Sequence, residues 1–194
     1  MKLLLYSQRL VLFVCTAFLF FLFADILVPL PEPYSDQQNT FSRVVVAEDG
    51  TPLRAFADKN GVWRYPVTID QVSPRYINTL LAYEDRWFYL HPGINPLSIM
   101  RAAWQNMTQQ RIISGGSTLT MQVARLLDPH QRTIAGKLKQ MFRALQLEWY
   151  YSKAEILTFY LNLAPFGGPL EGVQAASFAY LGKSAQELSL AEVA

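Results

Sequence analysis

Residues 133–165 read TIAGKLKQMFRALQLEWYYSKAEILTFYLNLAP, and this stretch decides the fold class. Its first half has apolar residues at helical spacing and predicts a helix over about residues 133–151. Ser152 and Glu155 match a capping box, so a second helix should begin there and end near Pro165. Two long successive helices indicate a mainly α-helical protein. The predicted inner face of the first helix consists of Leu138, Met141, Phe142, Leu145 and Trp149.

The same helical signals appear upstream of this stretch, from about residue 70 onwards. Ser73-Pro74 and Asn95-Pro96 each combine a capping residue with a proline in the first turn, which predicts two further helix starts. Near the last residue, Ser189 and Glu192 repeat the capping-box pattern. We therefore expect a helical domain over residues 71–194 that is incomplete at its C-terminal end.

The pattern before residue 70 is β-rich. Residues 41–47 and 53–57 are apolar runs joined by a segment that contains Asp49-Gly50, and Asp-Gly between such runs is a strong hairpin signal. Prolines at 29, 31 and 33 predict a stiff connection on the N-terminal side. Residues 31–70 are thus predicted to form a linker with a small β-hairpin.

Residues 10–30 are almost wholly apolar, with Asp25 as the only charged residue. A run of about 20 such residues can cross a bilayer as a helix. Lys2 and Arg9 precede it, so residues 1–9 are expected in the cytoplasm and the rest of the chain outside. The alternative is a cleaved signal peptide, whose apolar region is usually about 7–15 residues long and ends at small residues. The longer run favours a single retained transmembrane anchor.

The composition is that of a folded domain without strong charge bias. Hydrophobic residues make up 51% of the chain and charged residues 16%, which allows a buried core and excludes a disordered chain. The net charge is +2, and the basic residues are not gathered into a run, so no nucleic-acid partner is expected. The single cysteine, Cys15, excludes an intrachain disulfide framework.

Four clusters place polar residues and glycines where a helical core would not need them. Residues 84–93 (EDRWFYLHPG) follow a predicted helix. Residues 115–122 (GGSTLTMQ) open another helix, and backbone N–H groups at such a start suit a phosphate. A third cluster is basic, and the fourth combines residues 160–162 (YLN) with 166–168 (FGG). The basic cluster consists of Arg125, Arg132, Lys137 and Lys139.

Each cluster alone also has an ordinary structural interpretation. An acidic pair at a helix end is commonly a solvated cap, and a Gly-Gly-Ser-Thr turn is commonly only a turn and cap. The basic set fits a solvated face, and His91 fits a satisfied core histidine. We interpret Glu148 and Glu155 as structural. Spacing alone supports a helical, membrane-tethered domain that binds an anionic ligand.

Together, the clusters resemble the glycosyltransferase family 51 module of class A penicillin-binding proteins and related monofunctional transglycosylases. The resemblance rests on E-D-R-x-F-Y-x-H-x-G from Glu84, G-G-S-T-x-T-x-Q from Gly115, and S-K-x-E-I-L-x-x-Y-L-N from Ser152, in the family's order. It runs from about Val44 to the last residue and is closest to the 1C type, mainly through residues 145–149 and 164–168. Chance agreement of all three motifs is negligible.

The resemblance implies a mainly α-helical, lysozyme-like glycosyltransferase domain with a lobe against the membrane. The implied substrate is lipid II, and the reaction is an inverting transfer that releases undecaprenyl pyrophosphate. Glu84 is then the general base for the acceptor hydroxyl, and the pyrophosphate needs positive charge around it. Some family members also use a divalent metal there, which makes Mg²⁺ or Mn²⁺ a candidate cofactor. The implied substrate-binding residues are Arg86, Ser117, Thr118, Gln122, Arg125 and Lys137, with Arg132 as an addition.

Gln140 departs from the family pattern at a position where most members have a second glutamate, and we count it with Glu84 as a catalytic position. Glutamine can hold a hydrogen bond but cannot act as an acid or a counter-charge. Met121 and Leu126 also replace more usual residues, a glutamine and an asparagine. These departures keep open the alternative of a truncated or degenerate relative that binds lipid-linked glycan or wall-synthesis proteins without turnover.

The expected location is the inner membrane of a bacterium, with a cytoplasmic N-terminus and the catalytic domain in the periplasm. The expected partners are lipid II, the growing glycan strand, membrane lipid and other cell-wall synthesis proteins. A glycan hydrolase is a third hypothesis, suggested by the lysozyme-like fold alone. Both the anchor and the lipid-diphosphate pattern argue against it, and fold analogy cannot decide function.

Overall fold

A computed structural model describes residues 12–13, 16, 20, 42–48, 52–109, 111 and 115–193 of the 194-residue chain. The predicted anchor over residues 10–30 lies almost wholly outside the described residues, and the cytoplasmic segment 1–9 lies wholly outside them. In the described part of the chain, no helix combines the length and apolar character needed to cross a bilayer.

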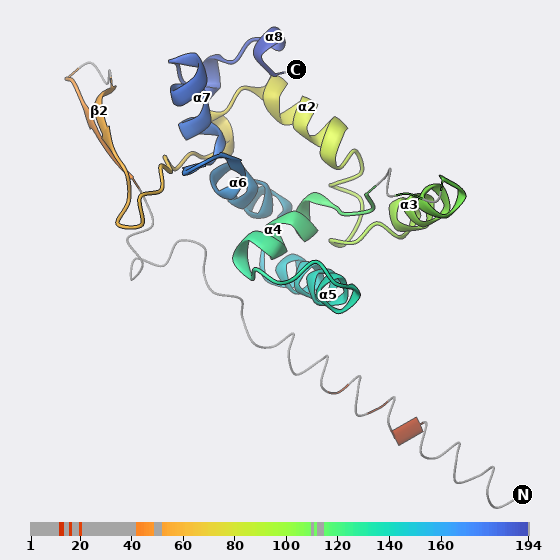
Figure 1. Cartoon of the computed structure of the whole chain (residues 1–194). Helices are drawn as coiled ribbons and strands as arrows, with labels where there is room; N and C mark the ends of the chain where they lie inside the picture. Colours follow the sequence, from red (N-terminus) through yellow and green to blue (C-terminus); the bar gives the residue numbers. More distant parts are fainter. Residues whose placement is uncertain are drawn as a thin grey trace, which may run out of the picture.

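Helices make up most of the described structure, which confirms the mainly α-helical prediction (Figure 1). The lysozyme-like topology and the membrane-proximal lobe stay predictions. In chain order the helices are η2 (Ile69–Gln71), α2 (Pro74–Glu84), α3 (Pro96–Gln109), α4 (Leu119–Leu127), α5 (Ile134–Tyr150), α6 (Lys153–Leu163), α7 (Val173–Leu181), η3 (Ala185–Glu187) and α8 (Leu190–Val193), of which η2 and η3 are short 3-10 helices.

Helices α2, α3, α5 and α6 begin where the capping residues predict. The side chains of Asn95, Thr133 and Ser152 each accept a hydrogen bond from the backbone N–H three residues further on, and α3, α5 and α6 follow them. The capping box of Ser152 and Glu155 is complete. Ser73 differs, because its hydroxyl donates to the carbonyl of Leu188 and so ties the start of α2 to the C-terminal segment. Local sequence therefore sets the helix boundaries.

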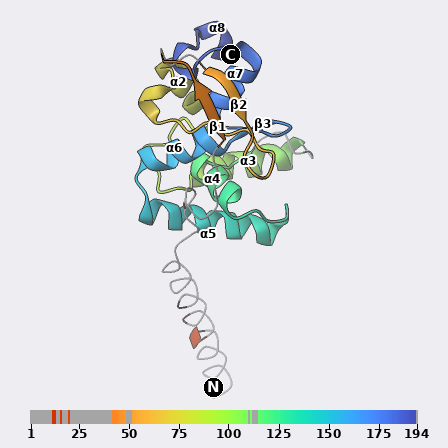
Figure 2. The ribbon, with the colours of Figure 1, turned by 90° about the vertical axis from the view of Figure 1, so that its left-hand side faces the viewer.

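Helix α4 lies at the centre of the body, packed against α5 and α6 (Figures 1 and 2). Its Leu119, Met121 and Val123 are fully buried, as are Ile156 and Leu157 of α6. Burial of large apolar side chains is the main stabilising contribution to such a core. The position of α4 also matters for function, since its N-terminal end borders the cleft described below.

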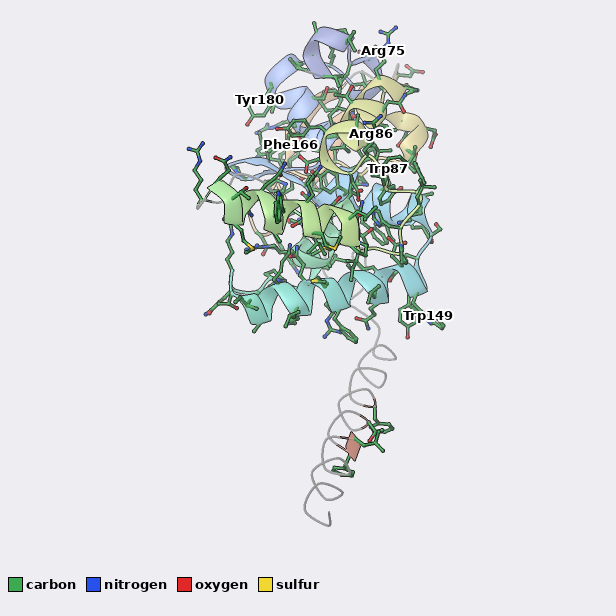
Figure 3. The ribbon with its side chains drawn as sticks, turned by 90° about the vertical axis from the view of Figure 1, so that its right-hand side faces the viewer. Arg75, Arg86, Trp87, Trp149, Phe166 and Tyr180 are labelled. Carbon is green, nitrogen blue, oxygen red and sulfur yellow. The ribbon has the colours of Figure 1, made fainter. Side chains whose placement is uncertain are left out.

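The predicted inner face of α5 is wrong. Leu138 and Trp149 are 61% and 74% exposed, and Figure 3 shows Trp149 pointing away from the body. Leu145 is also exposed, and Met141 and Phe142 are only partly buried. The buried residues of α5 are Gly136, Gln140, Ala144, Gln146 and Leu147. Gly136 allows the preceding loop at Gln131 to approach α5 closely, and Gln140 and Gln146 bond neighbouring groups, so small and polar residues take most of the buried positions.

Two small sheets lie on the N-terminal side and after α6. Strand β1 (Arg43–Val46) pairs antiparallel with β2 (Pro52–Phe56), as the sequence predicts for these runs. Strand β3 (Pro165–Gly167) pairs with β4 (Leu170–Glu171), and Trp63 bridges to Leu170. The buried side chain of Asn162 bonds both the N–H and the carbonyl of Val67, each at 2.8 Å. The segment before α2 is therefore fastened to the end of α6, while the division into linker and domain at residue 70 stays a prediction.

Candidate active site

A cleft of about 1130 Å³ brings together residues from α2, α4, α5 and the end of α6. It contains positions from all three motifs of the family resemblance, although these are far apart in the sequence. The predicted site residues that line it are Glu84, Ser117, Gln122, Arg125, Arg132, Lys137 and Gln140.

Glu84 is the last residue of α2, and its carboxylate lies in the cleft. Oε2 of Glu84 accepts a hydrogen bond of 2.7 Å from the Nε2 of Gln122 on α4. Burial raises the pKa of Tyr160 to about 12, and the negative charge of Glu84 adds to this effect. The pKa of Tyr76 is raised by burial, by Tyr160 and by Glu84. Both phenols thus stay protonated beside a carboxylate that can accept a proton.

Asp85 follows Glu84 directly but serves the core rather than the cleft. Its buried carboxylate accepts hydrogen bonds from the backbone N–H of Leu119 at 2.9 Å and from Nε2 of His91 at 2.9 Å. The bond to Leu119 holds the start of α4 beside the loop that follows α2. His91 is buried as its structural interpretation requires, although its Nδ1 has no hydrogen-bond partner among the described residues. The acidic pair therefore divides into one cleft residue and one structural residue.

Thr118 and Arg86 do not line the cleft. Thr118 is the N-cap of α4, is 2% exposed, accepts from the N–H of Met121 and donates to the carbonyl of Gly93. The guanidinium of Arg86 lies over the ring of Trp87. Figure 3 shows these two side chains on the loop after α2. Their substrate-binding roles stay predictions, and the structure gives Thr118 a clear structural role.

Gly93 shows why the first motif needs a glycine at its end. Its φ is +83°, a left-handed conformation that favours glycine. A Cβ at this position would lie 2.8 Å from the carbonyl oxygen of Ala144, so the loop and α5 approach too closely for any side chain. Gly93, whose carbonyl accepts the hydrogen bond from the Thr118 hydroxyl, is thereby held against α5.

Lys137 is one of the cations that line the cleft. Its Nζ donates to Oγ of Ser117 at 2.5 Å and to Oε1 of Gln140 at 3.0 Å. The Nε2 of Gln140 donates in turn to the carbonyl of Met121 at 2.6 Å. Burial lowers the pKa of Lys137, and the nearby charge of Arg125 lowers it further. Neutral groups therefore hold a partly buried cation in place.

Comparison with known proteins now identifies the domain. The transglycosylase family profile matches residues 49–194. The chain belongs to the transglycosylase family. It is 64% identical over 171 residues to penicillin-binding protein 1C of Escherichia coli (strain K12), an alignment that covers 88% of this chain and 22% of that protein. The resemblance to the glycosyltransferase module of class A penicillin-binding proteins is thus confirmed.

Two further relatives support the same assignment of the transglycosylase domain. Penicillin-binding protein 1A of Aquifex aeolicus (strain VF5) is 42% identical over 132 residues, which cover 68% of this chain and 18% of that protein. Penicillin-binding protein 1A of Escherichia coli (strain K12) is 38% identical over 152 residues, which cover 77% of this chain and 17% of that protein. The chain spans about a fifth of the length of these relatives.

As with Glu84 and Asp85, only some members of the basic cluster of the transglycosylase domain line the cleft. Arg125, Arg132 and Lys137 line the cleft, whereas Lys139 bonds Asp128 outside it. The hydrogen bond from Lys139 is the main cause of a lowered pKa of Asp128, and Arg143 contributes to it. Neighbouring positions on α5 thus serve the cleft and the surface separately.

Several residues of the cleft were missed by the sequence analysis. Tyr76 and Arg101 line it from α2 and α3, but no motif surrounds them. They reach the cleft only through the packing of helices that are distant in sequence, so no local signal could have found them. Tyr160 is different, because it belongs to the fourth polar cluster. Other lining residues without a signal are His130, Gln131 and Thr133.

The donor set of the cleft fits an anion better than a metal held by the protein. Mg²⁺ is usually bound by one or two carboxylates together with phosphate oxygens. Among the described residues that line the cleft, Glu84 is the only carboxylate, which is the minimum of that set. Arg101, Arg125, Arg132 and Lys137 line the same cleft and repel a metal cation. The described part of the chain has no group of three or more potential metal-ligating side chains. Its cations instead suit a multiply charged anion such as a pyrophosphate.

Proposed function

We propose that this chain is a peptidoglycan glycosyltransferase, anchored in the bacterial inner membrane, that polymerises lipid II into glycan strands. One observation carries the proposal: Glu84, the one carboxylate among the described lining residues, shares its cleft with Arg125, Arg132 and Lys137. Membership of the transglycosylase family supports it. The apolar run at residues 10–30 supports the anchor, and the periplasmic position of the domain follows from the charges that flank that run.

Glu84 acts as the general base in this proposal. The 4-hydroxyl of the acceptor sugar attacks the anomeric carbon of the donor strand, and its proton passes to the Glu84 carboxylate. The new bond joins the acceptor oxygen to that carbon, while the bond between that carbon and the pyrophosphate oxygen breaks with inversion. Gln122 orients the carboxylate through its hydrogen bond to Oε2. A base of this kind must be within hydrogen-bond reach of the proton that it takes.

The leaving group receives the electron pair as undecaprenyl pyrophosphate. Since this group departs as an anion, a general acid matters less than in ordinary glycoside hydrolysis, where a second carboxyl group protonates the leaving oxygen. Positive charge placed in advance around the pyrophosphate stabilises the developing charge in the transition state. Lys137, Arg125 and Arg132 supply that charge here, and Ser117 is bonded to Lys137 beside them.

The test is polymerisation of labelled lipid II by the full chain in detergent, beside its Glu84→Gln variant. We expect the wild type to make polymer and the variant to lose about 10²–10⁴-fold in rate, the range for removal of a general base. Glu187→Gln is the matched control, because it makes the same change at an exposed position outside the cleft. If the wild type binds lipid II but makes no polymer, the alternative of a binding relative without turnover replaces this proposal.

A further inference from the structure

Gln140 uses both halves of its amide at the cleft. Its Oε1 accepts from Lys137 at 3.0 Å, and its Nε2 donates to the carbonyl of Met121 at 2.6 Å. The side chain is 4% exposed, so water offers no ready substitute for either bond. A carboxylate at this position would keep the first bond, but it could not donate to the carbonyl of Met121 while ionised.

Lys137 also differs from the other bonded lysines of the described structure. Lys139, Lys153 and Lys183 each form an ion pair with a carboxylate. Lys137 bonds only the neutral side chains of Ser117 and Gln140, and it forms no ion pair within the described part of the chain. Its charge is therefore not compensated by a carboxylate of the described residues.

The surroundings of Lys137 increase this excess of positive charge. Arg101, Arg125 and Arg132 line the same cleft, against the single carboxylate of Glu84. Both burial and Arg125 lower the pKa of Lys137, which is the direction expected for a cation without a counter-carboxylate. An anion bound in the cleft would compensate this positive charge.

We propose that Gln140 is a positioning residue that holds Lys137 in place without neutralising it, so that fixed protein cations bind the pyrophosphate group without a divalent metal. The identity of the anion rests on the proposed function, whereas the metal independence rests on the donor set of the cleft. A carboxylate at position 140 would neutralise Lys137, and it would add a second carboxylate to the cleft that contains Glu84. It would thereby weaken the metal-free site and favour a bound cation.

The experiment is calorimetric titration of inorganic pyrophosphate into the full chain in detergent, once in EDTA and once with Mg²⁺. We expect the wild type to bind in EDTA, with no tighter binding in Mg²⁺. Gln140→Glu should bind about tenfold more weakly in EDTA, because one charge interaction at close range is lost. Mg²⁺ should restore part of its affinity, which loss of folding alone would not allow.

Gln146→Glu is the matched control. Gln146 is buried on the same helix and accepts a hydrogen bond from Arg143, but it does not line the cleft. We expect its pyrophosphate binding to equal that of the wild type in both buffers. Wild-type binding that requires Mg²⁺ would overturn the inference, and so would equal affinities of wild type and Gln140→Glu in EDTA.

Lipid II polymerisation, measured in the same two buffers, separates this inference from the proposed function. Metal-free binding of pyrophosphate without polymer formation would refute the function and leave the inference standing. Polymer formation that occurs only with Mg²⁺ would refute the inference and leave the function standing.

Discussion

Glu84 and Lys137 line the same cleft with opposite charges, and neutral side chains hold both. Gln122 donates to the carboxylate of Glu84, whereas Ser117 and Gln140 accept from Lys137. Neither charged group forms an ion pair within the described structure. Elsewhere the chain pairs its charges directly, as in Lys153 with Glu148. The difference shows that the carboxylate of Glu84 and the ammonium of Lys137 are each oriented by neutral groups, so that both remain available to a ligand.

This arrangement has a cost in stability. A partly buried charge without a counter-ion is less favourable than one that is paired. Protein families commonly accept such a cost at functional sites, where groups that would stabilise the fold would also block the chemistry. Substitutions of Lys137 and of the residues that bond it are therefore the most informative.

After Glu84→Gln, the largest effect is expected for Lys137→Met, which removes a cation that lines the cleft. We expect the polymerisation rate to fall by about 10²–10³-fold, the usual loss when a group that stabilises transition-state charge is removed. Pyrophosphate binding should weaken in parallel. Lys139→Met is the control, since Lys139 lies two residues away but is paired with Asp128 outside the cleft. Equal losses in the two variants would show that Lys137 has no special role.

A smaller effect is expected for Gln122→Met, beside Glu84. This change removes the donor to Glu84 but leaves the carboxylate itself. We expect about a tenfold loss of polymerisation rate, in line with a hydrogen bond to a charged group, and unchanged pyrophosphate binding. Gln186→Met serves as the control at an exposed amide outside the cleft. A loss as large as that of Glu84→Gln would mean that Gln122 contacts the substrate as well.

The contrast between the cleft and the rest of the chain also explains what the sequence could predict. Capping residues such as Thr133 and Ser152 act on backbone groups only a few residues away, so the helix starts were predicted correctly. Through the family resemblance, the motifs named seven of the residues that line the cleft, including Glu84 and Lys137. Spacing alone did not separate Glu84 from Asp85, because the two side chains diverge only where α2 ends, whereas the family resemblance named Glu84.

The orientation of α5 was the main error, and its cause is tertiary. Apolar periodicity assumes that the largest apolar side chains face the core. Apart from Leu147, the buried positions of α5 are occupied by the small or polar residues Gly136, Gln140, Ala144 and Gln146. Close packing at Gly136 and the bond of Gln140 to the carbonyl of Met121 need such residues, so tertiary contacts override the periodicity. Tyr76 and Arg101 were missed for a related reason, because distant helices bring them to the cleft.

The smallest effect is expected on the outward face of α5, for Leu138→Gln. Leu138 is 61% exposed, so the free energy of unfolding should change by less than about 0.5 kcal/mol, as for ordinary surface substitutions. Leu147→Ala is the control on the same helix, where a fully buried side chain is truncated and about 2–5 kcal/mol should be lost. Thermal unfolding of both variants in detergent measures the contrast.

The result also tests whether Lys137 points into the cleft, because Leu138 follows Lys137 directly on α5. Successive residues on a helix point about 100° apart, so an outward Leu138 is compatible with Lys137 at the cleft and Gln140 beneath it. If Leu138→Gln destabilised the chain as strongly as Leu147→Ala, Leu138 would be buried and α5 would be rotated. Lys137 would then lose its bonds to Ser117 and Gln140, and the separation of charges along the cleft would have no structural basis.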